Sequence, residues 1–432
     1  MNDNIQIDKE LIKLRNFIKK TKIFHFYKSK FFYFKQKKNI NLTQKHYKQI
    51  AEKLKKRGQT PIRFACYVMY ATDFAEKEVF SIMINDDDFD PKVVIIPDIS
   101  RGQKHMISNY NETKRFLENK FGNNYLLDGY DVTSNSFFDF SDKFDIIAMN
   151  NPYDEMAHKF HRIEYLCKKN LLLISTTYAF LALNYTQNHI FPRFEFNLLW
   201  KYFIDTEYGF KECKQKSLYK AKNVLVYGYP KMDTFAKCIE TQRIRKRIII
   251  APHHTVNVSS LPLSNFMKYY NLIPELPDLF PEIDFIFRPH PLLFTNLINK
   301  RYWTEKQVTN YLTTIKSKNI IYSTDGDYLE LFKNSDAIIH DCGSYITEWL
   351  FTGKPCCFVA NDKSIFNFFS PLGLECIKNY TIAYSREQII DFIKNVMDNN
   401  ISDYPNQEIL KNKVMINYPN VSQRIVNYLK LR

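Results

Sequence analysis

Residues 335–349 read SDAIIHDCGSYITEW, and this stretch decides the fold. A short apolar run at residues 337–339 leads directly into polar residues and then into an amphipathic helix that ends near Gly353. A near-continuous apolar strand followed by a helix is the repeating unit of a parallel sheet that is covered on both faces. The stretch therefore predicts an α/β fold and places its polar residues where such sheets bind ligands, beyond the carboxyl end of a strand.

Apolar runs of the same kind recur along the chain in two series. The first series comprises residues 62–68, 92–97, 145–149, 170–175 and 223–227. The second comprises residues 247–251, 284–287, 319–322, 337–340 and 355–359. Two such series predict two doubly wound, Rossmann-type domains in the two-lobed arrangement called GT-B.

The pattern also predicts where the domains begin and end. A cluster of charged residues at positions 237–247 separates the two series and reads as a basic linker. We expect a basic, aromatic-rich helical N-terminal extension, an N-terminal Rossmann-like acceptor domain, a C-terminal Rossmann-like nucleotide-donor domain and a helical tail that breaks near Pro419. Their predicted bounds are residues 1–60, 61–240, 241–405 and 406–432.

Composition limits the class of protein. The chain has 432 residues of which 45% are apolar, enough for more than one hydrophobic core. Its eight cysteines form no CxxC pair, so we expect reduced structural thiols and no zinc site. No signal peptide and no apolar run of about 18 residues is visible, so no transmembrane helix is expected.

Positive charge is concentrated at the N-terminus. The formal net charge is +15, and residues 1–60 hold 17 Lys and Arg against 4 Asp and Glu, which leaves +2 for residues 61–432. Residues 22–35 mix lysines with phenylalanines and tyrosines, a composition that suits an anionic membrane surface. A structural extension that covers the main body and a nucleic-acid-binding arm are the alternatives, and the near-neutral remainder disfavours nucleic acid as a partner.

Three strands of the second series end in polar residues, and together they predict one anion site. The strand ends read APHHT at residues 251–255, RPHP at residues 288–291 and HDCGS at residues 340–344. His253 and His254 are expected at the moving phosphoryl group, with Thr255 beside them at the donor. Prolines on both sides stiffen the loop at His290, and Arg288 can pair with two phosphate oxygens at once.

The third strand end carries the most specific pattern. Gly343 is expected to permit a tight turn, and Ser344 falls at the N-cap of the following helix, where free N–H groups attract phosphate. Glu348 lies one turn further on the same face and could accept a hydrogen bond from a ribose hydroxyl. Asp341, Gly343, Ser344 and Glu348 are therefore expected to bind the donor.

The order APHHT, RPHP, SDAIIHDCGSYITEW and GKPCCF resembles the catalytic half of the CDP-glycerol glycerophosphotransferase family. That family builds teichoic acids and related surface polymers. The resemblance implies a GT-B enzyme that moves a polyol phosphate from a CDP-activated donor to a cell-surface glycan or its lipid-linked precursor, without metal or cofactor. It also implies a cytoplasmic protein held peripherally on the inner face of the cell membrane. In the family motif, His290, Asp341, Ser344 and Glu348 are the matching residues.

The chain departs from the family in its first half. Family members often carry a Trp-His-Gly loop whose histidine is the expected base, and this chain has no such triplet. The best substitutes follow the run at residues 145–149: Asp154, with Glu155 and His158 nearby. We therefore expect His290, Asp154 and His253 to be the catalytic residues, and Lys231 at the domain junction to face the cleft.

Two other functions fit the same residues. A GT-B sugar transferase that uses a nucleotide sugar would need the same diphosphate site. A membrane- or nucleic-acid-binding protein would act through residues 1–60 and would need none of the strand-end residues.

Overall fold

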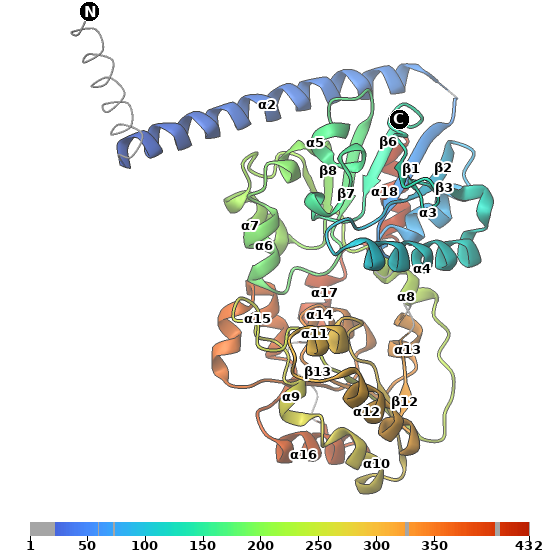
Figure 1. Cartoon of the computed structure of the whole chain (residues 1–432), viewed down its shortest axis with the longest axis vertical. Coiled ribbons are helices and arrows are strands. Elements are labelled where there is room, and N and C mark those ends of the chain that lie inside the picture. Colours follow the sequence, from blue (N-terminus) through green and yellow to red (C-terminus); the bar gives the residue numbers. More distant parts are fainter. Residues whose placement is uncertain (1–21, 59, 72–73, 325–327, 402–406, 432) are drawn as a thin grey trace, which may run out of the picture.

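The computed structural model describes residues 22–58, 60–71, 74–324, 328–401 and 407–431, with side chains from Phe32 onward except that of Thr186. The chain forms two lobes, each built around a parallel sheet (Figure 1). In the first lobe seven strands lie in the order β3-β2-β1-β6-β7-β8-β9. Their bounds are β1 Ile62–Val68, β2 Phe89–Ile95, β3 Leu126–Asp128, β6 Ile146–Met149, β7 Leu172–Thr176, β8 Lys201–Ile204 and β9 Val224–Val226.

The second lobe holds six parallel strands in the order β12-β11-β10-β13-β14-β15. Their bounds are β10 Lys246–Ala251, β11 Ile283–Phe287, β12 Ile321–Tyr322, β13 Ala337–His340, β14 Cys356–Val359 and β15 Thr381–Ala383. This is the strand order of a Rossmann domain, and the first sheet extends the same order by one strand. The predicted class, a GT-B-like α/β fold of two doubly wound domains with a basic helical N-terminal extension, is confirmed.

Helices cover both sheets, which explains why the strands are apolar on both faces. Around the first sheet lie α2 Lys22–Lys56, α3 Lys77–Ile84, α4 Gln103–Phe121, α5 Ile163–Leu166, α6 Asn184–Ile190, α7 Glu207–Lys216 and α18 Val421–Leu429. The helix α8 Lys231–Lys237 lies between the lobes, and its Met232 and Phe235 belong to the second-lobe core. The second lobe holds α9 Phe266–Tyr269, α10 Leu276–Leu279, α11 Leu293–Asn299, α12 Glu305–Ser317, α13 Leu329–Lys333, α14 Tyr345–Glu348, α15 Pro371–Ile377, α16 Arg386–Met397 and α17 Gln407–Val414. A two-stranded hairpin joins β4 Tyr130–Asp131 to β5 Ser136–Phe137. All eight cysteines are free thiols, and seven of them are buried.

The long helix α2 has two different parts. Its C-terminal part packs on the first lobe: Ile40 and Tyr47 are buried, and the Tyr47 hydroxyl donates to the Leu198 carbonyl at 2.9 Å. The part before Ile40 projects into solvent: its N-terminal end extends beyond the body (Figure 1), and Phe32 is 60% and Phe34 is 65% exposed. Phe32 still borders a pocket that Glu164 and Phe194 of the first lobe also line. The boundary at residue 60 stays a prediction, and residues 1–21 lie outside the described residues. Among the described helices, α2 included, we find none with the length and apolarity that a membrane crossing requires.

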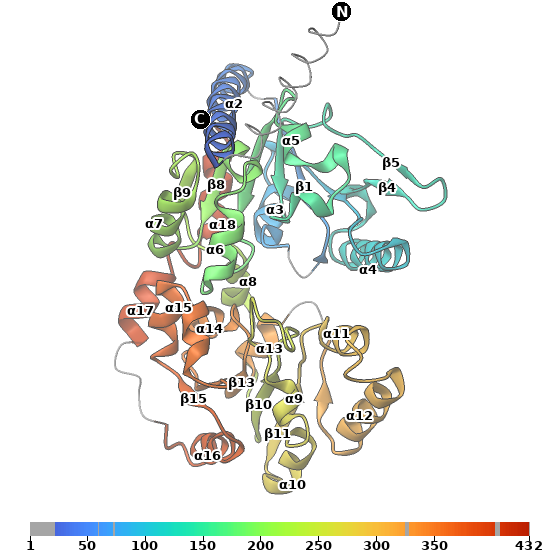
Figure 2. The same cartoon turned by 60° about the vertical axis from the view of Figure 1, so that its left-hand side comes forward.

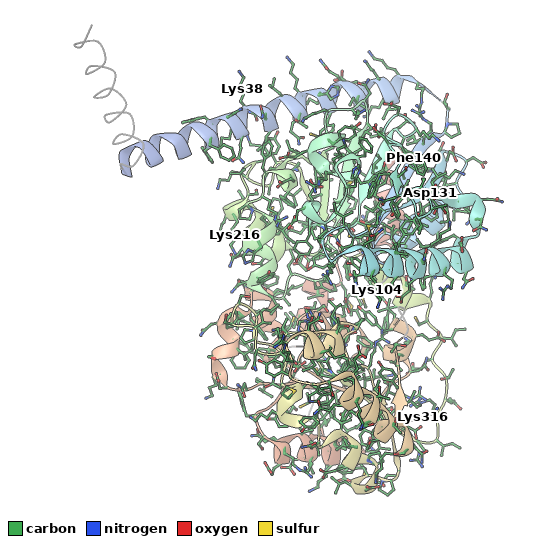
Figure 3. The ribbon with its side chains drawn as sticks, viewed as in Figure 1. Lys38, Lys104, Asp131, Phe140, Lys216 and Lys316 are labelled. Atoms are coloured by element: carbon green, nitrogen blue, oxygen red, sulfur yellow. The ribbon has the colours of Figure 1, made fainter. Side chains whose placement is uncertain are left out.

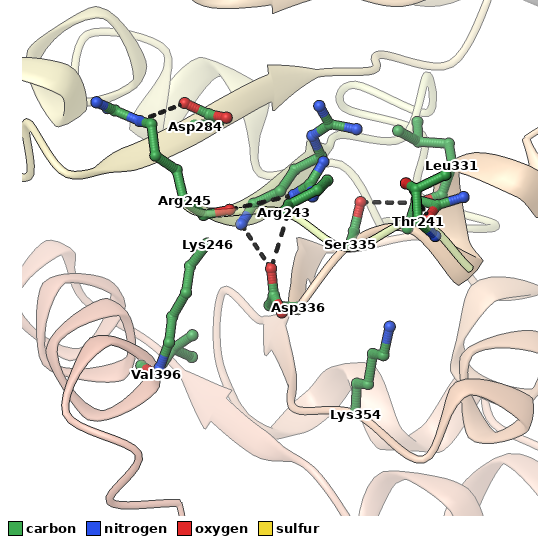
Figure 4. Close-up of polar contacts among 12 residues, drawn as sticks. Thr241, Arg243, Arg245, Lys246, Asp284, Leu331, Ser335, Asp336, Lys354 and Val396 are labelled. Carbon is green, nitrogen blue, oxygen red and sulfur yellow. Dashed lines mark hydrogen bonds and ion pairs between the residues drawn. The ribbon is translucent and has the colours of Figure 1, made fainter.

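The basic linker is attached to the second lobe by its charged side chains (Figure 4). Arg245 pairs with Asp284 at 2.7 Å, and Arg243 lies 3.7 Å from Asp336. The Lys246 ammonium donates to main-chain carbonyls at the end of α16. These contacts hold residues 243–246 against the rim of the second sheet.

The C-terminal helices link the lobes a second time. In α17, Leu410 and Val414 belong to the core of the second lobe, whereas Ile425 and Leu429 of α18 pack in the core of the first (Figure 2). The amide of Ser422 at the start of α18 donates to a buried carboxylate in α8 at 2.6 Å. The chain thus passes between the lobes twice, and both passages are anchored.

Replacing Tyr47 by Ala should test the packing of α2. The change removes a fully buried ring and its hydrogen bond, so we expect the free energy of unfolding to fall by about 3–5 kcal/mol. Tyr33→Ala on the projecting part of the same helix should change it by less than about 0.5 kcal/mol. Denaturant unfolding of both variants measures this, and equal effects would contradict the assignment of Tyr47 to the core.

Candidate functional site

Three histidines lie together at the carboxyl ends of β10 and β11. The ring centroids of His253 and His254 are 4.4 Å apart, and that of His290 lies 4.1 Å from His254 and 5.3 Å from His253. The two strands are neighbours in the parallel sheet, so the loops that follow them meet at one edge. The His290 amide donates to the Pro252 carbonyl at 3.0 Å, which fixes one loop against the other.

Hydrogen bonds at Nδ1 fix the protonation of two of these rings. Nδ1 of His290 accepts the Leu292 amide proton at 3.1 Å. Nδ1 of His254 accepts from the Asn296 side-chain amide at 3.0 Å, and that amide also donates to the His254 carbonyl at 3.2 Å. Burial lowers the pKa of His254 to about 4 and that of His290 to about 3. Both rings are therefore neutral at pH 7 and carry their proton on Nε2.

The three imidazoles offer ring nitrogens within 4.8 Å of one another, a spacing that a metal ion could use. A neutral ring whose Nδ1 accepts a proton donor has no free lone pair at Nε2 for a cation. The hydrogen bonds of His254 and His290 therefore favour an anionic ligand over a metal ion at this cluster. The expected absence of metal and cofactor stays a prediction.

Asp341 supports the cluster from behind. Its Oδ1 accepts the His253 amide at 2.6 Å and its Oδ2 accepts the Asn265 amide at 2.5 Å. Burial raises the pKa of this carboxyl to about 7. Because main-chain amides occupy both oxygens, Asp341 positions the loop that carries His253, and its predicted direct contact with a donor stays a prediction. Thr255 is also buried, with Oγ1 at 2.9 Å from Nδ1 of His253.

A second group of contacts surrounds Tyr328. Its hydroxyl donates to Glu348 at 2.6 Å, and Lys231 donates to that hydroxyl at 2.9 Å from the helix that follows β9. The guanidinium of Arg288 lies 5.2 Å from the Tyr328 ring centroid and donates to Ser323 at 2.8 Å. The structure thus brings Glu348, Arg288 and Lys231 to one aromatic ring. Tyr328 is not among the site residues predicted from the sequence; its one signal is its place a few residues beyond the run at residues 319–322.

The turn at Gly343 and the N-cap position of Ser344 are both present, with local details that the sequence did not show. Gly343 is not among the residues with positive φ. The glycine is also needed for close approach, because a Cβ there would lie 2.3 Å from the side chain of Leu183 in the first lobe. Ser344 has helical backbone angles, and its side chain makes no capping hydrogen bond. The helix α14 that it precedes has only four residues before a 3-10 turn at Trp349–Thr352, so it offers less of a dipole than expected.

The first-lobe candidates lie apart from the histidine cluster. Oδ1 of Asp154 accepts the Ile163 amide at 2.7 Å, and burial raises the pKa of this carboxyl to about 7. Glu155 pairs with Arg193 at 2.8 Å, and the His158 ring stacks on Phe137. In the described part of the chain these three side chains contact only first-lobe residues. The role of Asp154 as a base stays a prediction.

The neutral state of His290 predicts a pH-dependent stability. An unfolded histidine takes up a proton near pH 6.5, whereas the folded pKa of His290 is about 3. The unfolded chain therefore binds more protons as the pH falls from 6.5 towards 3, and stability is lost over that window. Between pH 7.5 and 5, His290→Gln should lose up to about 2 kcal/mol less unfolding free energy than the wild type. His189→Gln, at an exposed site, should follow the wild type in denaturant titrations; an equal acid response of all three proteins would contradict the neutral assignment.

Comparison with known proteins gives one family match and several fold matches. The model of the family described as CDP-Glycerol:Poly(glycerophosphate) glycerophosphotransferase matches residues 199–431, more than half of the chain. No curated protein matches.

Among solved structures, the wall teichoic acid polymerase TagF soaked with CDPG is 13% identical, with a TM-score of 0.58 over 95% of this chain and 98% of that one. The UDP-GlcNAc 2-epimerase of Methanocaldococcus jannaschii in complex with UDP-GlcNAc and UDP is 14% identical, with a TM-score of 0.55 over 86% of this chain and 100% of that one. At these identities the likeness shows the GT-B-like fold. The family match extends over β8 and β9 of the first sheet, the whole second lobe and the final helices. The chain therefore belongs to the CDP-Glycerol:Poly(glycerophosphate) glycerophosphotransferase family of enzymes.

Proposed function

We propose that this enzyme transfers a polyol phosphate, glycerol phosphate or a similar group, from a CDP-activated donor to a cell-surface glycan or its lipid-linked precursor. The observation that carries the proposal is the pair of Nε2–H donors on His254 and His290 at the carboxyl ends of β10 and β11. Arg288, on the same loop as His290, adds a guanidinium for the nucleotide diphosphate. Family membership supports the choice of a CDP-linked donor.

The arrangement suits phosphoryl transfer. The P–O bond to CMP breaks, the acceptor oxygen forms the new P–O bond and gives its proton to a base, for which Asp154 is the candidate, and negative charge spreads over the equatorial oxygens. Hydrogen-bond donors that are already held in place stabilise this charge without reorganising. His253, whose loop is held by Asp341, would be the third imidazole at the transferred phosphate. Glu348 would exchange its hydrogen bond from Tyr328 for one from a ribose hydroxyl. Catalysis then rests mainly on positioning and charge stabilisation.

His290→Ala should lower turnover with CDP-glycerol by at least about 100-fold, because it removes one fixed donor from the charged transition state. CMP release measures the rate. His189→Ala, at an exposed position in α6, serves as the matched control and should leave the rate unchanged. Near-wild-type turnover by a folded His290→Ala protein would remove His290 from the mechanism.

The donor base can be tested without an acceptor. A ligand that binds only the folded state raises the melting temperature. CDP and CMP should do so here, and UDP and UMP should do so less. The opposite ranking would replace the proposed function by the nucleotide-sugar transferase.

We further propose that the projecting part of α2 binds an anionic membrane surface on the cytoplasmic side. Phe32 and Phe34 are exposed there, Lys37 lies 4.7 Å from the Tyr33 ring, and Lys38 stands on the outer side of the helix (Figure 3). Rings and cations on one exposed helix can meet the interface and the phosphate headgroups together. Residues 1–21, which hold five Lys and Arg against three Asp and Glu, lie outside the described residues.

Removing residues 1–38 should release the enzyme from anionic vesicles and keep its turnover on a soluble acceptor. This cut spares Ile40, Tyr47 and Ile50, which belong to the first-lobe core. Each cation near an anionic leaflet contributes about 1 kcal/mol at best, so high salt should weaken attachment of the full-length protein. Vesicle sedimentation measures binding. Equal sedimentation of both proteins would show that the segment is a structural extension.

A further inference from the structure

A buried carboxylate fixes an arginine at the end of β2. Asp98 is fully buried, and its Oδ1 accepts from the amide of Ser100 at 2.8 Å and from its hydroxyl at 2.6 Å. Its Oδ2 accepts from the Tyr70 hydroxyl and lies 3.3 Å from Nε of Arg101. Arg101 is not among the site residues predicted from the sequence. Its guanidinium is held in place by a side chain that is itself fixed on both oxygens.

Arg101 stands on the loop between β2 and α4, two residues before α4 begins. The helix α4 runs along the side of the first lobe that faces the second, and Lys104 in its first turn lies at that edge (Figures 1 and 3). Burial of the two rings is the main cause that lowers the pKa of His254 and of His290, and the positive charge of Arg101 is a further cause for both. The field of this first-lobe cation therefore reaches the histidine cluster of the second lobe.

The guanidinium has capacity for an anion. Within the described residues, Asp98 engages Nε of Arg101, and no contact is found for Nη1 or Nη2. These two nitrogens are a planar pair of donors, which fits two oxygens of one phosphate. Arg101 remains 41% exposed at its side chain, so a ligand can reach it.

The second lobe has little free positive charge for the group that moves. His254 and His290 are neutral, and Arg288 is engaged with Ser323 and the Tyr328 ring. Lys300, the other cation whose charge acts on His254, donates to a main-chain carbonyl at 2.7 Å. Arg288 would supply the donor diphosphate with one guanidinium, so the outer phosphate at His254 and His290 would meet neutral hydrogen-bond donors. Neutral donors stabilise developing charge less than a cation does.

We propose that Arg101, positioned by Asp98, binds the phosphate of the group being transferred from the side opposite His254 and His290. The inference rests on the proposed function, since it presumes a nucleotide diphosphate donor at the histidine cluster. Arg101 would compensate the charge on the equatorial oxygens while the bond to CMP breaks and the bond to the acceptor oxygen forms. It exchanges no proton, because a guanidinium stays protonated in proteins.

The test compares Arg101→Gln with Arg115→Gln. Arg115 is exposed on α4 and lies about 20 Å further along the helix axis, so it is a matched loss of charge. The rate of CMP release from CDP-glycerol with a soluble glycerol-phosphate primer should fall about 100-fold or more in Arg101→Gln. By calorimetry, affinity for CDP-glycerol should fall about 10-fold and affinity for CMP, which lacks the transferred phosphate, should not change. Arg115→Gln should match the wild type throughout.

Conservative variants separate charge from structure. Arg101→Lys keeps the charge but loses the planar pair of donors, so it should recover only part of the turnover. Asp98→Asn keeps Arg101 but weakens the ion pair that positions the guanidinium. This variant should lower kcat more than it raises the KM for CDP-glycerol. Thermal unfolding of each variant confirms that it is folded.

Each outcome decides a different point. If Arg101→Gln behaves like Arg115→Gln, the proposed role of Arg101 is overturned. Equal losses of affinity for CMP and for CDP-glycerol would also overturn it, because they would mark a nucleotide-binding or structural residue. If the wild type itself binds no CDP-glycerol, the proposed donor is wrong. If the wild type binds it but does not turn over the primer, the two affinities still decide the role of Arg101.

Discussion

The site depends on one buried carboxylate, that of Asp341 at the end of β13. Its two oxygens accept the amides of His253 and Asn265, so the loops before α9 are tied to the central strand of the second sheet. Desolvation of a carboxylate is costly, and two amide donors offset part of that cost. The same loop receives the His290 amide at Pro252. Removing the carboxylate would therefore loosen the loop that carries His253 and His254, although it accepts only a main-chain amide from His253.

Much of this site could be predicted from sequence because it follows from parallel-sheet geometry. Buried strands are apolar on both faces, so their runs mark the sheet, and neighbouring strands bring His254 and His290 to one edge. Contacts that depend on distant segments carry no such signal. Gly343 faces Leu183, and Tyr328 joins Glu348 to Lys231, across sequence separations that no local pattern records. Ser344 was placed correctly at the N-cap by pattern, but its side chain makes no capping hydrogen bond because its backbone is already helical.

Composition misleads where one segment has two environments. The net charge counted over residues 1–60 combines two kinds of segment. One is basic and exposed, and the other consists of turns of α2 whose apolar side chains belong to the first-lobe core. A helix that packs Tyr47 against the lobe and keeps its lysines outside has the same net charge as a helix that is free in solution. Net charge therefore cannot distinguish the two. The register of Ile40, Tyr47 and Ile50 is consistent with one helical face, but only the partner surface shows which turns it covers.

The distribution of charge between the lobes bears on why both are needed. At its strand ends the second lobe combines neutral imidazoles with the buried guanidinium of Arg288, whereas the more exposed cation Arg101 belongs to the first lobe. Contacts such as those of Ser370 with the carbonyls of Leu181 and Ala182 hold the lobes in register. On the proposed mechanism, a donor that meets only the second lobe would bind without full charge compensation at the phosphorus. Activation would then require the lobe that presents the acceptor, which disfavours transfer to water when no acceptor is in place.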